Sequence, residues 1–150
     1  MNKSEIARSY FMSGCNCSQS VLTAFAEETG LSPDITLRIA DGFGAGMGRT
    51  QEVCGAVTGG IMVIGLLFGK GAGETHEEKG ILYARIRHFM EAFGKAYGSV
   101  NCKQLLNGCD LLTLEGQATF KERNLRDTCA GFVASACEIL TKEIALNTTE

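Results

Sequence analysis

Seven cysteines are the residues of this sequence that could most readily do chemistry. They are Cys15, Cys17, Cys54, Cys102, Cys109, Cys129 and Cys137. Their number is odd and the first residues resemble no secretory leader, so we expect no secreted disulfide framework. We expect instead a reducing cytoplasm, where thiols serve as metal ligands, as redox groups or as core residues.

The cysteines form no local metal-binding or redox motif. The sequence has no CxxC, no HExxH and no pair of CxxC units at zinc-ribbon spacing. A site must therefore be assembled from cysteines that are far apart in the chain, and the local setting of each one becomes informative.

Two cysteines directly follow an asparagine. Cys17 follows Asn16, and Cys102 follows Asn101. Because asparagine is a favoured N-cap residue, each of these cysteines is predicted to lie at the first position of a helix.

Two further cysteines come shortly after a residue that can cap a helix. Cys54 lies four residues after Thr50, and Cys129 lies two residues after Asp127. Together with the previous pair, they place four cysteines within about the first turn of four separate predicted helices.

A helix N-terminus favours the ionised form of a thiol. The first-turn amides have no acceptor within the helix, and the helix dipole adds positive potential there. We therefore expect lowered pKa values for these four thiols, and the thiolate is the form that binds metals and attacks disulfides. Helix N-termini that meet at one point would suit an anionic cluster or a dithiol pair of low pKa.

The remaining three cysteines have other settings. Cys137 lies on the apolar face of the last predicted helix, about 12 Å along the axis from Cys129, which is too far for a disulfide between them. We interpret Cys137 as a packing residue. Cys15 and Cys109 lie outside helix starts and could be spare thiols or additional ligands.

The elements that must position the cysteines are predicted to be helices throughout, in a single all-α domain over residues 1–150. Hydrophobic residues make up 45% of the chain, and its formal net charge of -3 indicates no nucleic-acid partner. The uncharged stretch 53–69 is short and rich in glycine, which favours a buried central helix over a membrane span. In that helix, Gly55 and Gly59 would let a second helix approach closely.

Two long helices complete the predicted bundle. One opens at the capping box of Thr75 and Glu78, carries an apolar stripe from Leu82 to Tyr97, and closes at Gly98. The other spans about 127–145. Because the stripe and the uncharged helix offer more apolar surface than a small bundle needs, we expect a homodimer.

A glycine-rich loop precedes Cys54. In residues 42–48 glycine stands at every second position, which matches neither GxGxxG nor the Walker pattern and therefore does not support nucleotide binding. Arg49 ends this loop and would either place positive charge near a thiolate or face solvent. We interpret His76 as a solvated residue at the start of the long helix and His88 as a surface or half-buried residue of it; either could serve as a ligand, but neither has a supporting motif nearby.

Several segments, taken in order, resemble the C_GCAxxG_C_C family of redox-active proteins. They are GCNCSQSVL at 14–22, GFGAGMG at 42–48, CGAVTG at 54–59, GSVNC at 98–102 and CAGFV at 129–133. The resemblance implies that the defining cysteines are Cys17, Cys54, Cys102 and Cys129, the four that capping selects independently. Cys15, Cys109 and Cys137 have no counterpart in that pattern.

The resemblance also suggests a cofactor. A similar module occurs in split-Soret cytochromes, where it is associated with an iron–sulfur centre. This sequence has no CxxCH motif and would carry no haem. The substrate of the family is not established, and the resemblance leaves open whether the protein is an enzyme.

Three hypotheses follow for the four cysteines. In the first, most or all of Cys17, Cys54, Cys102 and Cys129 bind an iron–sulfur cluster for electron transfer to an unknown partner, with an outside ligand if only three take part. In the second, the protein is a metal-free dithiol/disulfide oxidoreductase in which Cys54 attacks and Cys17, Cys102 or Cys129 resolves. In the third, the four cysteines hold a structural zinc ion in a non-enzymatic protein.

Overall fold

The computed structural model describes residues 1–146 of the chain, and within them the fold is all-α, as predicted. The helices are α1 (Lys3–Met12), α2 (Cys17–Ala24), α3 (Ala26–Thr29), α4 (Pro33–Asp41), α5 (Gly55–Phe68), α6 (His76–Tyr97), α7 (Cys102–Leu105), α8 (Leu114–Glu122) and α9 (Leu125–Ala145). Extended pairing in this part of the chain is limited to one isolated antiparallel bridge between Val53 and Asn101.

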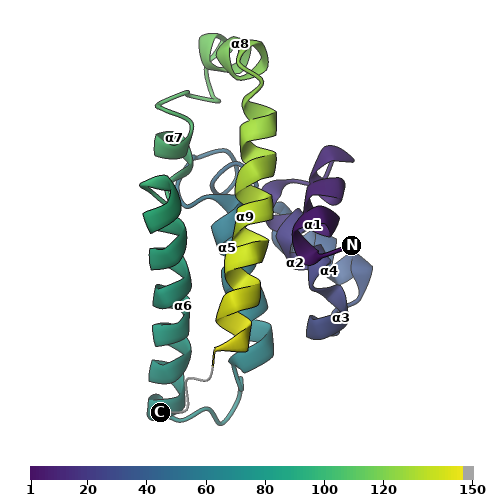
Figure 1. The fold of residues 1–150 in the computed structure, drawn as a ribbon, viewed down its shortest axis with the longest axis vertical. Helices are drawn as coiled ribbons and strands as arrows, with labels where there is room; N and C mark the ends of the chain where they lie inside the picture. The colour runs from purple at the N-terminus through teal and green to yellow at the C-terminus, as the bar shows by residue number, and fades with distance from the viewer. Residues whose placement is uncertain (147–150) are drawn as a thin grey trace.

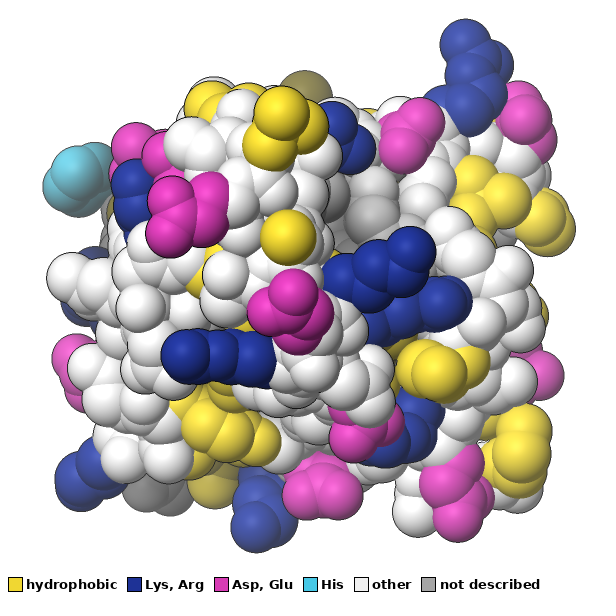
Figure 2. Space-filling view, turned by 90° about the horizontal axis from the view of Figure 1, so that it is seen from above, with side chains coloured by type: hydrophobic (Ala, Val, Ile, Leu, Met, Phe, Trp, Pro, Cys, Tyr) yellow, Lys and Arg dark blue, Asp and Glu magenta, His cyan; other side chains and the backbone are white. Residues whose placement is uncertain are grey.

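The helices pack in two groups. The long helices α6 and α9 run alongside each other, and α5 packs against both (Figure 1). Helices α1 to α4 gather on one side, where α1 packs on α9 and α2 packs on α5. Helix α8 lies at the end of the molecule that is uppermost in Figure 1. Seen from above, the surface mixes basic, acidic and apolar side chains (Figure 2).

Several helix ends follow the local signals in the sequence. Asn16 caps α2 through its side-chain oxygen, and Asn101 caps α7 in the same way. Thr75 and Glu78 form the predicted capping box of α6. Gly98 ends that helix in the left-handed conformation that glycine adopts without a Cβ clash.

The start of α5 differs from the prediction. Thr50 does not cap it, because its hydroxyl donates to the carbonyl oxygens of Gly46 and Met47 within the preceding turn. The helix begins at Gly55, and Cys54 itself is the N-cap residue. Cys54 therefore lies closer to the helix start than the sequence suggested.

The start of α9 also differs. The helix begins at Leu125, directly after Asn124 in a left-handed conformation, so Asp127 is an internal residue and not the cap. Cys129 consequently lies in the second turn of α9. Asn124 is a residue type that favours the N-cap position, but its side chain makes no capping hydrogen bond here, and the sequence pattern indicated a start at Asp127 instead.

Two glycines let α2 approach α5 closely, as predicted. A Cβ atom on Gly59 would lie 2.9 Å from the Ser18 carbonyl oxygen, and one on Gly55 would lie 3.0 Å from the Cys17 Cβ. On another face of α5, a Cβ on Gly60 would lie 2.3 Å from the ring of Phe89 in α6. These contacts need glycine, because any side chain would force the helices apart.

Helix α5 is uncharged, and Val57, Val63 and Ile64 are fully buried. Within residues 1–146, no helix combines the length and the apolar character needed to cross a membrane. The predicted homodimer stays a prediction.

Arg85 of α6 and Glu143 near the end of α9 form a buried ion pair that joins the two helices. The guanidinium of Arg85 donates to the backbone oxygen of Glu143 at 2.7 Å and stacks over the ring of Phe68 at 3.8 Å. The Glu143 carboxylate is itself buried and is hydrogen-bonded to His88. These contacts hold the C-terminal part of α9 in register with α6.

Candidate functional site

Four cysteines from four segments line one cavity of about 170 Å³. They are Cys17, Cys54, Cys102 and Cys129, the same four that the sequence selected. The rest of the lining is mostly apolar, with Phe11, Phe120 and Phe132 among its members. The fold therefore brings together thiols that are far apart in the sequence.

Cys54 and Cys102 are brought together by a short antiparallel pairing. The Cys54 amide donates to the Val100 oxygen at 2.8 Å, and the Cys102 amide donates to the Glu52 oxygen at 2.7 Å. In this pairing Cys54 lies opposite Val100, and Cys102 comes two residues after Val100. Because side chains two residues apart in an extended segment point to the same face, both thiols are directed to one side. Both thiols are largely buried.

Cys17 is positioned by the start of α2. The Asn16 side chain accepts from the Gln19 amide at 2.9 Å, and the Gln19 side chain accepts from the Asn16 amide at the same distance. Asn16 also donates to the Asp41 oxygen, which ties α2 to the end of α4. Gly44 lies against Asn16, because a Cβ atom on Gly44 would lie only 2.6 Å from the side-chain nitrogen Nδ2 of Asn16. The glycine-rich loop thus packs directly on the N-cap of the Cys17 helix.

Cys129 completes the cavity from α9, and its thiol shares a hydrogen bond with the thiol of Cys17. This bond lowers the pKa of Cys129, because the Cys17 thiol donates to the Cys129 thiolate. The same bond, together with burial, raises the pKa of Cys17 well above its ordinary value. The pair therefore holds a single negative charge most easily on Cys129.

The other two thiols are harder to ionise. Burial raises the pKa of Cys54 to about 12, although the backbone amides of Ala56 and Val57 oppose the rise. Burial also raises the pKa of Cys102 to about 11, against a hydrogen bond from Gln51 that lowers it. The sequence predicted lowered pKa values for all four thiols, and that prediction is wrong for three of them. Removal from water is the larger cause at Cys54 and Cys102, whereas at Cys17 the hydrogen bond with Cys129 is the larger cause and burial adds to it.

None of the other three cysteines lines the cavity. Cys137 is fully buried in the hydrophobic core, as expected for a packing residue. The Cys109 thiol is buried and donates to the Gly116 oxygen at 3.1 Å. Cys15 is half-buried.

Other side chains considered from the sequence also lie outside the cavity. Arg49 is exposed and is not part of the lining, so it faces solvent. His76 is exposed at the start of α6, and His88 is engaged with Glu143. Neither histidine lines the thiol cavity.

The four thiols surround the cavity and do not meet at one point. Within residues 1–146, no three side chains of His, Cys, Asp or Glu are arranged to hold one metal ion.

Comparison with protein families gives one match. The family model described as "Putative redox-active protein (C_GCAxxG_C_C)" matches residues 15–143, which include all four cavity cysteines. The chain belongs to the C_GCAxxG_C_C family. No curated protein and no solved structure matches the chain.

The geometry explains two sequence features of this C_GCAxxG_C_C protein. In the 54–59 stretch, Cys54 lines the cavity, while Gly55 and Gly59 receive α2. In the 42–48 loop, Ala45 and Gly46 reach the cavity wall. The cysteines therefore line the cavity, and the glycines of residues 42–48 and 54–59 let the segments that carry Cys17 and Cys54 pack closely around it.

Sequence reasoning missed one polar residue of the site. Gln51 is only 4% exposed, and its side chain donates to the Cys109 oxygen and accepts from the amide of Leu111, a residue that lines the cavity. It lies among polar residues between the glycine-rich loop and Cys54, and nothing in that local pattern signals burial.

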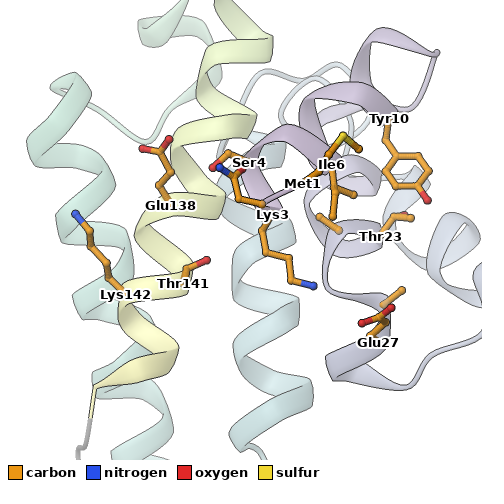
Figure 3. A pocket seen from close by; sticks show the side chains of 13 residues that line it. Met1, Lys3, Ser4, Ile6, Tyr10, Thr23, Glu27, Glu138, Thr141 and Lys142 are labelled. Carbon is orange, nitrogen blue, oxygen red and sulfur yellow. The ribbon is translucent and has the colours of Figure 1, made fainter.

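A larger, open groove of about 880 Å³ lies elsewhere in the C_GCAxxG_C_C protein. Lys3, Tyr10, Glu27, Glu138 and Lys142 line it, from α1, α3 and α9 (Figure 3). No cysteine is among the residues of the described part of the chain that line this groove. The thiol cavity, although smaller, is where the reactive side chains gather.

Proposed function

We propose that this C_GCAxxG_C_C protein binds an iron–sulfur cluster on Cys17, Cys54, Cys102 and Cys129 and uses it for electron transfer. The observation that carries the proposal is the cavity of about 170 Å³ that these four thiols line. Its volume corresponds to several water molecules at about 30 Å³ each. Protein interiors contain few voids larger than one water molecule, so a cavity of this size with four thiols suits a bound group.

The donor set fits such a cluster. Iron–sulfur clusters are held by cysteine thiolates, and four cysteines are the usual complement. Burial disfavours thiolates at Cys54 and Cys102 as long as no cation is near. A coordinating metal reverses that preference, because it deprotonates the thiol outright.

Residues around the thiols would set the properties of the bound group. The amides of Ala56 and Val57 act on the Cys54 sulfur, and hydrogen bonds to ligand sulfurs are one determinant of cluster potential. Leu111, Phe120 and Phe132 line the cavity and limit the access of water. The cluster would supply the one-electron chemistry, and the protein supplies ligands, amide dipoles and exclusion of solvent.

A second candidate function uses thiols alone, and the hydrogen bond between Cys17 and Cys129 favours it. In this mechanism the Cys129 thiolate attacks a substrate disulfide, forms a mixed disulfide and releases one substrate thiolate. The Cys17 sulfur, after losing its proton, then displaces the second substrate thiolate. The substrate disulfide is reduced to two thiols, and the protein is oxidised to a Cys17–Cys129 disulfide. The lowered pKa of Cys129 makes it a better attacking thiol than Cys54, which the sequence analysis had suggested.

Purification without oxygen separates the two functions. We expect brown protein that contains iron and acid-labile sulfide, loses both in the Cys54→Ser and Cys102→Ser variants, and keeps both in Cys15→Ser. Cys54 and Cys102 are suitable because the dithiol mechanism does not require them. Metal-free protein that loses two thiols on mild oxidation, with a Cys17–Cys129 linkage found by mass spectrometry, would contradict the cluster and establish the dithiol function. Stoichiometric zinc without redox activity would contradict both.

A further inference from the structure

Two of the four cavity thiols are closed off from solvent. Cys54 is 5% exposed and Cys102 is 8% exposed, although both line the cavity. A group must reach the sulfur atoms in order to bind to them or react with them. Part of the cavity wall therefore has to move aside when such a group enters.

Residues 109–123, which we call the strap, form one side of that wall. Leu111 and Phe120 of the strap line the cavity. The outer side of the strap faces solvent, where Leu112 is 70% exposed and Leu114 is 85% exposed. Helix α8, which makes up most of the strap, packs on α9 and lies at the uppermost end of the molecule in Figure 1. The strap therefore covers the cavity as an outer layer.

Hydrogen bonds within the strap join the loop before α8 to the helix itself. The Cys109 thiol donates to the Gly116 oxygen at 3.1 Å. The Gln117 side chain donates to the Leu111 oxygen at 3.0 Å. The Thr113 hydroxyl caps α8 by accepting from the Gly116 amide at 2.9 Å. Because these bonds cross-link the strap, we expect the loop and the helix to open together as one cooperative unit.

Left-handed residues flank the strap on both sides. Asn107 with a φ of 55° and Gly108 with a φ of 81° precede it, and Asn124 with a φ of 50° follows it. Asparagine and glycine tolerate more backbone conformations than other residues do. Hinges are a few such positions, in loops or at the ends of elements, that absorb a change in φ and ψ. The strap therefore has a suitable hinge at each end.

The side chain of Gln51 ties the strap to the loop that precedes Cys54. Its Nε2 donates to the Cys109 oxygen and its Oε1 accepts from the Leu111 amide, both at 2.8 Å. Gln51 is 4% exposed, and its own amide donates to the Ala45 oxygen at 3.1 Å, which fixes the point of attachment. Because one carboxamide makes both bonds to the strap, the two bonds form and break together.

We propose that the strap opens about these hinges to admit a group to the thiol cavity, and that Gln51 is the latch that keeps it closed. Opening breaks both Gln51 bonds and withdraws Leu111 and Phe120 from the cavity wall. The ion pair between Lys103 and Asp110 also joins the strap to α7, but it is partly exposed to solvent and therefore weak. The inference rests on the proposed function only in giving the cavity a group to admit.

Two substitutions remove the latch. Gln51→Asn tolerates the left-handed φ of 59° at this position, but its side chain is one methylene shorter and cannot reach both backbone partners. Gln51→Gly removes the side chain and adopts the same φ without strain. If one variant fails to fold, the other decides. Gln104→Asn is the matched control, since it shortens an exposed glutamine of α7 that lies outside the strap.

The measurement is amide hydrogen–deuterium exchange, followed residue by residue by NMR in reduced, metal-free protein. A nine-residue helix without its packing is unstable in water, so opening of the strap exposes the amides of residues 118–122 in α8. We expect these amides to exchange about tenfold faster in both Gln51 variants, because the loss of two hydrogen bonds raises the population of the open form. Amides of residues 132–140 in α9 should keep the wild-type rate, and Gln104→Asn should change neither set.

Three results would overturn the proposal. Unchanged exchange in α8 would show that Gln51 does not hold the strap. Faster exchange confined to the Leu111 amide, which Gln51 bonds directly, would show a local contact and no movement of the strap as a unit. Faster exchange throughout α5 and α9 would show a loss of global stability. Since the protein is free of metal in every case, the outcome does not depend on whether it can bind iron.

Discussion

The thiols of Cys17 at the start of α2 and Cys129 in the second turn of α9 are hydrogen-bonded to each other. Their helices come from opposite ends of the sequence, and α2 packs against α9. The bond divides two chemically identical groups into a donor that stays protonated and an acceptor that ionises. This difference can be measured in the metal-free protein, whichever group the cavity holds.

The first prediction concerns the order in which the thiols react. A lowered pKa leaves more Cys129 as thiolate at any pH below its ordinary value, whereas the raised pKa of Cys17 leaves less. We expect iodoacetamide to label Cys129 first among the cavity thiols near neutral pH, as followed by mass spectrometry. Cys17→Ala removes the donor and should slow the labelling of Cys129, while Cys17→Ser supplies a hydroxyl donor and should slow it less. Equal rates in the two variants would argue against the hydrogen bond.

The second prediction concerns stability in alkaline solution. The folded protein raises the pKa of Cys54 and Cys137 to about 12, and that of Cys102 to about 11, from an ordinary value of 9.0. Their stabilising contribution is complete below pH 9, where the thiols are neutral in both states. This stability is lost as the pH rises from 9 through the folded-state pKa values, because the thiols ionise first in the unfolded chain. Each thiol should lower the free energy of unfolding by about 1.4 kcal/mol per pH unit in this range.

Urea unfolding of metal-free protein over a series of alkaline pH values measures this slope. Cys137→Val removes one ionisable thiol from the core and keeps an apolar side chain, so the decline should be shallower by about one proton's contribution. A Cys137→Val slope identical to that of the wild type would show that Cys137 does not take part.

The third prediction compares two glycines of α5. Gly60→Ala should lower the free energy of unfolding by about 1–3 kcal/mol, because the new Cβ would lie 2.3 Å from the Phe89 ring. Gly65→Ala is the matched control, since its Cβ would meet no atom within 4 Å. The control should leave stability unchanged or raise it by up to about 1 kcal/mol through helix propensity. Thermal unfolding followed by circular dichroism distinguishes the two, and similar effects in both variants would contradict the close packing of α5 on α6.

The fourth prediction concerns the ion pair between α6 and α9. Arg85→Met should lower the free energy of unfolding by about 3 kcal/mol or more, because it leaves the buried Glu143 carboxylate without its guanidinium partner. Arg87→Met changes an exposed arginine two residues away and should have little effect. Chemical denaturation measures both, and equal small losses would show that Glu143 is satisfied without Arg85.

The sequence by itself determined the features that depend on neighbouring residues. Asn16 and Asn101 cap helices because a side-chain oxygen needs only an amide three residues later. Gly98 ends α6 for an equally local reason, the left-handed conformation. The all-α class and the placement of Cys17 and Cys102 at helix starts follow from such signals, and the family pattern identified Cys54 and Cys129 as well.

Only the tertiary structure decided which thiols ionise and what surrounds them. The pKa of Cys54 depends on burial by side chains from other elements, and the pKa of Cys129 depends on a thiol from the other end of the chain. The burial of Gln51 likewise depends on a loop on one side and residues 109–111 on the other. Desolvation and long-range hydrogen bonds arise from groups that are distant in sequence, so they cannot be predicted from the residues next to each cysteine.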